Sequence, residues 1–77
     1  MVQIKLLGID DNIIRYSYKP EGEGTDGILA YNKKTDEEII EAMAERDFKE
    51  WSARSHVFDM IRKNIDNLPK ERTLMWY

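Results

Sequence analysis

The stretch TDEEIIEAMAER, residues 35–46, decides the fold because it has features of both a helix and a strand. Thr35 and Glu38 form a capping-box pattern, which favours a helix. A single helix over residues 36–68 would be roughly 50 Å long, however, in a domain about 25–30 Å across. We therefore expect a hairpin loop and then a fourth strand within residues 39–44, and we retain the helix as the alternative.

The segment that follows has an amphipathic pattern and predicts a helix over about residues 48–67. Asp47 followed by Glu50 marks its start as an aspartate variant of the capping box. Pro69 marks its end, because proline disfavours helical backbone at the residue before it. The apolar arc of this helix consists of Trp51, Val57, Phe58, Ile61, Ile65 and Leu68.

Three strands are predicted ahead of the deciding stretch. Residues 2–9 and 12–19 alternate apolar with polar side chains, which is the period of a half-buried strand. Residues 27–32 are short, apolar and bounded by Gly and Asn, so they predict a third strand. The β-prone ending ERTLMWY, residues 71–77, predicts a last strand that returns to the sheet.

These elements define one α+β domain over residues 1–77: an antiparallel β-meander of four strands, one amphipathic helix and a C-terminal strand. The alternative order is β-β-β-α-α-β, with residues 36–46 helical. A domain of this length buries only about 60% of the surface of its unfolded chain, so its core is thin. The chain has no cysteine and hence no disulfide, so we expect homodimerisation to add stability.

Composition argues against several classes of function. The net charge is −3, and residues 35–50 carry seven acids and two bases, so we do not expect nucleic acid as a partner. A single histidine and no cysteine exclude a metal site built on thiolates or on several imidazoles, and we expect no metal and no cofactor. The glycine-rich residues 20–27 match neither a calcium loop nor a phosphate loop, and we interpret them as a connector. Without a leader or a bilayer-spanning apolar run, we expect a cytoplasmic protein with no membrane contact.

Aromatic side chains and one arginine are the candidate interaction residues. On an open sheet face, tyrosines could stack with the bases of single-stranded nucleic acid or contact a protein. Tyr16 and Tyr18 share a face with Ile14, however, and the helix must cover one face, so an aromatic core is the favoured interpretation. The candidate interaction residues are Arg15, Tyr16, Tyr18, Tyr31, Trp76 and Tyr77.

Two helix residues are candidates for other roles. Arg54 falls within the apolar arc, where a charge is costly unless paired, and Glu50 one turn earlier suits an i, i+4 ion pair. We expect a structural Glu50–Arg54 pair, and an anion-binding arginine is the alternative. His56 is the only side chain that titrates near neutral pH, but it lies nearly opposite the apolar arc without an orienting third group. A solvated surface histidine is therefore favoured over a functional one.

The runs GILAYNKKTDEE, AERDFKEWSARSH, LP and MWY resemble a family of small bacterial and phage-borne proteins. The resemblance covers roughly residues 11–77, and its motifs are turns, a helix start and a terminal aromatic pair. It implies a β-hairpin ahead of the helix, because the family is β-rich where this chain has EIIEAMAE, although Ala42, Met43 and Ala44 depart from that pattern. The family has no established activity, so the resemblance assigns no catalytic or binding residue.

We expect a non-catalytic protein–protein interaction or homodimerisation module with an unidentified protein partner. No acid, base and nucleophile converge at a recognisable spacing, so no enzymatic activity is predicted. The alternative is a nucleic-acid-binding accessory protein that uses Arg15, Lys19 and the tyrosines on an open sheet face. The apolar side chains expected on the sheet face away from the helix are Leu7, Ile13 and either Leu29 or Ile28.

Overall fold

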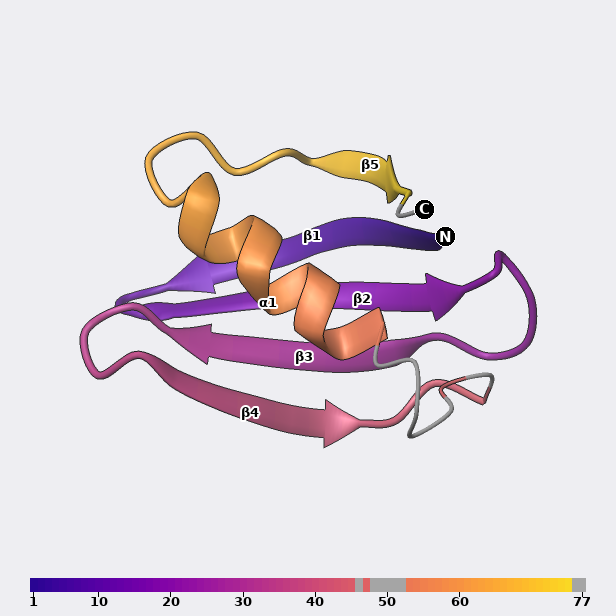
Figure 1. Cartoon of the computed structure of the whole chain (residues 1–77). Helices are drawn as coiled ribbons and strands as arrows, with labels where there is room; N and C mark the ends of the chain where they lie inside the picture. Colours follow the sequence, from indigo (N-terminus) through magenta and orange to yellow (C-terminus); the bar gives the residue numbers. More distant parts are fainter. Residues whose placement is uncertain (46, 48–52, 76–77) are drawn as a thin grey trace.

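An antiparallel five-stranded sheet with a helix across one face forms the fold (Figure 1). The computed structural model of the protein describes residues 1–45, 47 and 53–75. The elements are β1 (Val2–Asp10), β2 (Ile13–Pro20), β3 (Gly27–Asn32), β4 (Glu37–Ala42), α1 (Ala53–Lys63) and β5 (Glu71–Leu74). The strand order is β4-β3-β2-β1-β5, so the first four strands form a meander and β5 returns beside β1. The predicted α+β class and order of elements are confirmed.

Within the deciding stretch, Glu37–Ala42 form a strand, which begins and ends two residues before the predicted range 39–44. β4 pairs antiparallel with β3 at one edge of the sheet, so the helical alternative for residues 36–46 is wrong. Asn32 explains why no helix starts here: its Oδ1 accepts hydrogen bonds from the backbone N–H groups of Lys34 and Thr35, at 2.9 and 3.2 Å, as in an Asx turn. Asp36, with a φ of 63°, then turns the chain into β4.

Helix α1 covers part of the predicted range. Residues 48–52, where we predict the helix start, lie outside the described residues. At its other end α1 stops at Lys63 rather than at Asn67. The helix tightens at this end, because the Asn64 N–H is shared between the Met60 and Ile61 carbonyls, at 3.0 and 3.3 Å, and the Asn64 side-chain amide also donates to the Met60 carbonyl at 2.8 Å. The chain then continues in a turn, in which the Asn67 N–H donates to the Asn64 carbonyl at 2.9 Å.

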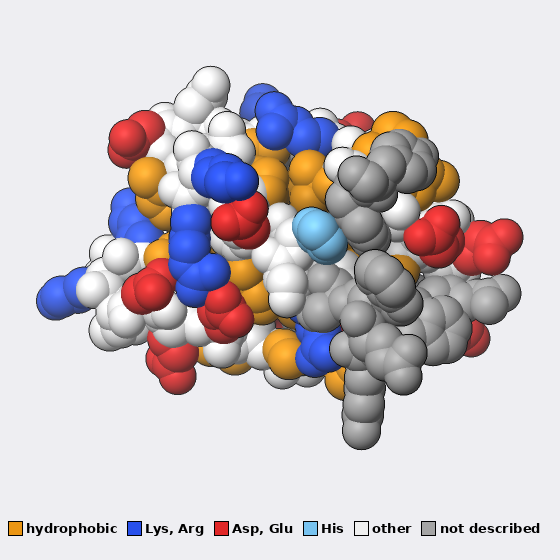
Figure 2. All heavy atoms as spheres, in the orientation of Figure 1, with side chains coloured by type: hydrophobic (Ala, Val, Ile, Leu, Met, Phe, Trp, Pro, Cys, Tyr) orange, Lys and Arg blue, Asp and Glu red, His pale blue; other side chains and the backbone are white. Residues whose placement is uncertain are grey.

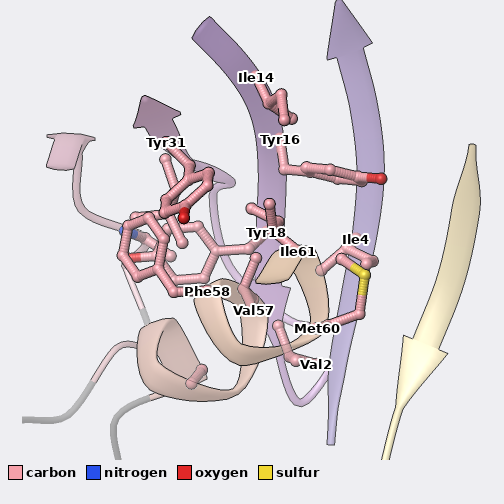
Figure 3. Packing of buried hydrophobic residues seen from close by; sticks show 13 residues of the cluster. Val2, Ile4, Ile14, Tyr16, Tyr18, Tyr31, Val57, Phe58, Met60 and Ile61 are labelled. Carbon is pink, nitrogen blue, oxygen red and sulfur yellow. The ribbon is translucent and has the colours of Figure 1, made fainter. Parts of the chain in front are cut away.

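The core lies between α1 and the sheet face that it covers (Figure 3). Because successive side chains of a strand alternate between faces, every second residue of β2 and β3 points toward α1. Tyr16, Tyr18 and Tyr31 are among them, and all three are buried, as the aromatic-core interpretation predicts. The residues labelled in Figure 3 are Val2, Ile4, Ile14, Tyr16, Tyr18, Tyr31, Val57, Phe58, Met60 and Ile61.

The glycine-rich segment connects β2 to β3, as predicted. Gly22 and Gly24 have φ values of 70° and 79°, in the left-handed region that glycine adopts at little cost. The backbone N–H of Glu21 donates to the Met1 carbonyl at 2.8 Å, so the start of this connector also extends the pairing of β2 with β1.

Candidate interaction surface

The sheet face opposite α1, which we call the open face, has an apolar centre. Ala30 of β3 lies between Arg15 of β2 and Ile39 of β4 in the strand register. It is 1% exposed because its neighbours shield it. The sequence left open whether Ile28 or Leu29 lies on this face. Leu29 is buried under α1, so Ile28 is the open-face residue. The apolar centre consists of Ile13, Ile28, Ala30 and Ile39.

Charged side chains of opposite sign flank the apolar centre. Arg15 and Lys19 lie on the β2 side, whereas Glu37 and Glu41 lie on the β4 side. The Arg15 Nε donates a 2.9 Å hydrogen bond to Glu41 Oε1 across β3. The Lys19 ammonium lies 3.4 Å from the Asp26 carboxylate. Such exposed pairs add little stability, but they give the open face a basic and an acidic half.

A polar hollow of about 450 Å³ adjoins the basic half, where β1, β2 and β5 meet. Gln3 and Thr73 are partners in the register beside it, and Lys19 also lines it. Ser17, which is 8% exposed, has its hydroxyl 3.5 Å from the Lys5 carbonyl, the outer limit of a hydrogen bond. The hollow therefore carries polar groups that suit a hydrated contact.

A buried polar cluster lies on the helix side of the sheet. The Tyr18 hydroxyl donates to Asp47 Oδ2 at 2.6 Å and accepts from the Ala44 N–H at 3.1 Å. Arg54 Nε lies 2.9 Å from the same carboxylate oxygen, although without hydrogen-bond geometry, so the contact is an ion pair. The Asp47 side chain is 0% exposed. Burial and, next, the hydrogen bond to Asp47 raise the pKa of Tyr18 from 10.0 to about 12.

We expect the protein to lose stability between pH 10.0 and about 12 as Tyr18 ionises. In this window unfolded tyrosine has lost its proton while native Tyr18 retains it, so the free energy of unfolding falls as pH rises. Over the whole window the free energy of unfolding should fall by ~3 kcal/mol. Urea unfolding of the wild type and of Tyr18→Phe, each at about pH 9 and at about pH 11.5, measures how much unfolding free energy each protein loses. The variant should lose less stability, and equal losses in both proteins would contradict this expectation.

A second polar cluster joins the end of α1 to the β3–β4 hairpin. Arg62 Nε donates to Asp36 at 2.9 Å, and Arg62 Nη2 lies 2.7 Å from Glu38. The guanidinium carbon is 5.2 Å from the Tyr31 ring centroid, and the Tyr31 hydroxyl donates to Asp36. The hydrogen bonds from Tyr31 and Arg62 lower the pKa of Asp36. Figure 2 shows bases and acids intermixed on this side of the molecule.

The structure separates the candidate interaction residues. Arg15 lies on the open face, whereas Tyr16, Tyr18 and Tyr31 are buried under α1. Residues 76–77 lie outside the described residues. Arg15 and the three tyrosines therefore do not form one stacking platform.

The helix candidates are placed as follows. Of the predicted ion pair, Glu50 lies outside the described residues, and Arg54 contacts Asp47. His56 is exposed on α1 (Figure 2). Sequence reasoning missed the role of Asp47 because it sought a partner for Arg54 only at helical spacing. The position of Asp47, an acid just ahead of the helix that carries Arg54, could have indicated this ion pair.

No family model matches this chain, and no curated protein or solved structure shows a detectable similarity to it. Among the residues that the structure describes, no helix is long and apolar enough to cross a membrane. Within the same residues, no three histidine or carboxylate side chains are grouped so that they could hold a metal ion. The functional proposal below is therefore based on the geometry of the surfaces.

Proposed function

We propose that the protein is a non-catalytic interaction module that forms a homodimer through its open face. The observation that carries this proposal is the apolar centre on a sheet face that α1 leaves uncovered. Sheets with one apolar face and one helix layer gain stability when a second layer covers that face. A second copy supplies such a layer without any other component.

The charges of the open face support a second copy as the occupant. A two-fold axis along β3 would bring β2 of one copy over β4 of the other, as isologous symmetry requires. Arg15 would then lie over Ile39 of the second copy, between its Glu37 and Glu41, while the two apolar centres meet on the axis. Complementary charges of this kind set the orientation of an interface.

The size of the open face limits how tightly two copies can bind each other. Five strands about 4.8 Å apart and strands of about six residues give a face of roughly 24 by 20 Å. The footprint is on the order of 500 Å² per copy and 1,000 Å² in total, at the lower end of specific interfaces. We therefore expect a dimer that dissociates in the micromolar range.

Sedimentation of the wild type from ~1 to ~500 µM should show a reversible monomer–dimer equilibrium. Ile39→Glu places a charge in the apolar centre and should leave a monomer across this range. Ile40→Glu is the matched control, because Ile40 is the next residue of β4 and points to the helix side, where it is half exposed. A wild type that stays monomeric, or equal effects of both variants, would reject the dimer.

We also propose a cytoplasmic location, supported by a chain without cysteine, and membership of the small bacterial and phage-borne family named above. The β-hairpin ahead of the helix is what that resemblance implies, and it supports the assignment. Fractionation of the source cell tests the location. Recovery of the protein with the membrane or outside the cell would contradict it.

A further inference from the structure

Strand β1 has a free edge along its second half. β5 pairs only with Val2–Lys5, and the last contact on this side is a 2.7 Å hydrogen bond from the Leu6 N–H to the Lys70 carbonyl. Among the described residues, no strand pairs with Leu7–Asp10 on this side.

The backbone groups that face this edge can be assigned. Asp10 and Ile13 close the two-residue turn between β1 and β2, so their N–H and C=O groups face each other. Backbone groups alternate sides along a strand, so the N–H and C=O of Ile9 face away from β2. A β-bulge at Leu7 precedes this point. Ile9 therefore offers a donor and an acceptor to an added strand.

The groove beside this edge is mainly apolar. It has a volume of about 780 Å³, and its lining consists of Leu6, Leu7, Gly8 and Pro69 together with the charged Lys5, Lys70 and Glu71. Leu7 is 50% exposed, and Ile9, further along the edge, is 54% exposed. An extended peptide paired with β1 would cover both side chains, because strand addition uses backbone bonds for affinity and alternate side-chain sites for specificity.

Strand direction decides which end of such a peptide meets the groove. β5 runs antiparallel to β1 and begins at Glu71, level with Lys5. A peptide antiparallel to β1 along Leu7–Asp10 would lie in line with β5 and run toward its first residue. Its C-terminus would therefore end beside Lys70, which forms no ion pair with any described residue. Lys5 is close by, 4.0 Å from Glu71.

We infer that the β1 edge at Leu7–Asp10 binds the carboxyl-terminal segment of a partner polypeptide by strand addition, with the terminal carboxylate at Lys70 and Lys5. The two ammonium groups complement the carboxylate, and among the residues that the structure describes Glu71 is the one acid that lines the groove. This site is independent of the homodimer proposal, because it uses the sheet edge rather than the apolar centre of the open face.

The test uses a blocked hexapeptide of alternating threonine and valine, N-acetylated, with either a free carboxylate or an amide at its C-terminus. Binding to the full chain is followed by the amide resonances of Leu7–Asp10 and Lys70. The free acid should shift these resonances and should bind about tenfold more tightly than the amide. Lys70→Gln should remove most of this preference, and Glu71→Gln should increase affinity for the acid.

Ile9→Pro separates strand addition from simple surface contact. Proline removes the outward N–H and leaves the ladder to β2 intact, because proline is tolerated where the N–H faces away from the sheet. Binding should be lost in Ile9→Pro and kept in the control Ile9→Val, with both variants folded by circular dichroism. Equal binding by the two variants, equal binding of acid and amide, or shifts confined to the open face would overturn the inference. Shifts at Leu7–Asp10 that depend on protein concentration alone would overturn it as well, in favour of a second copy.

Discussion

Gly27→Ala should destabilise the protein by about 3 kcal/mol or more, because the new methyl group has no room. A Cβ on Gly27 would lie 2.2 Å from Tyr18 Cε1, 2.5 Å from the Ala44 nitrogen and 2.7 Å from the Ala42 carbonyl oxygen. Two of these atoms belong to the backbone. The third belongs to a fully buried ring whose hydroxyl is held by two hydrogen bonds. None of them can move without breaking β4 pairing or the buried cluster.

Thermal unfolding followed by circular dichroism measures this effect. For a domain of this size, a loss of about 3 kcal/mol lowers Tm by ~12 °C or more. Gly8→Ala is the matched control, since a Cβ on Gly8 would meet nothing within 4 Å. It should change the unfolding free energy by no more than about 0.5 kcal/mol. If Gly27→Ala is as stable as Gly8→Ala, the packing of Tyr18 against β3 is not as described.

The strands could be predicted from local patterns, and β4 shows where those patterns reach their limit. Residues 27–32 were predicted with the bounds that the structure has, because short apolar runs flanked by Gly and Asn suit a central strand. The composition of β4 instead resembles a helix, with three Glu and one Ala among its six residues. At the sheet edge its side chains are mostly exposed, so pairing with β3 and the Asn32 turn outweigh the weak helical preference.

The interaction surface was harder to predict than the fold, because its contacts depend on register. Arg15 and Glu41 are 26 residues apart and meet only because β2, β3 and β4 align as they do. Tyr18 and Asp47 are 29 residues apart, and no spacing rule links them. Alternation predicted that Tyr16 and Tyr18 share a face. The residues that neighbour these tyrosines on adjacent strands, however, are determined only by how the strands pair in the folded sheet.

Asp47→Ala should cost about 3 kcal/mol, because it leaves a buried tyrosine hydroxyl without its acceptor and a guanidinium without its counter-charge. Asp47 Oδ2 is 2.6 Å from the Tyr18 hydroxyl and 2.9 Å from Arg54 Nε. The Arg54 side chain is only 19% exposed, so water can restore little of the lost interaction. Removing one member of a buried pair is costly mainly because the other member stays buried and charged.

A double-mutant cycle distinguishes this explanation from a general loss of packing. Replacing a buried pair with apolar residues of similar volume is often neutral, so Asp47→Leu combined with Arg54→Met should recover most of the stability lost in Asp47→Leu alone. The tyrosinate absorbance gives a second readout: without the Asp47 carboxylate, the pKa of Tyr18 should fall from about 12 toward its ordinary value. Additive losses in the cycle, together with an unchanged Tyr18 titration, would show that the three side chains are neighbours without being coupled.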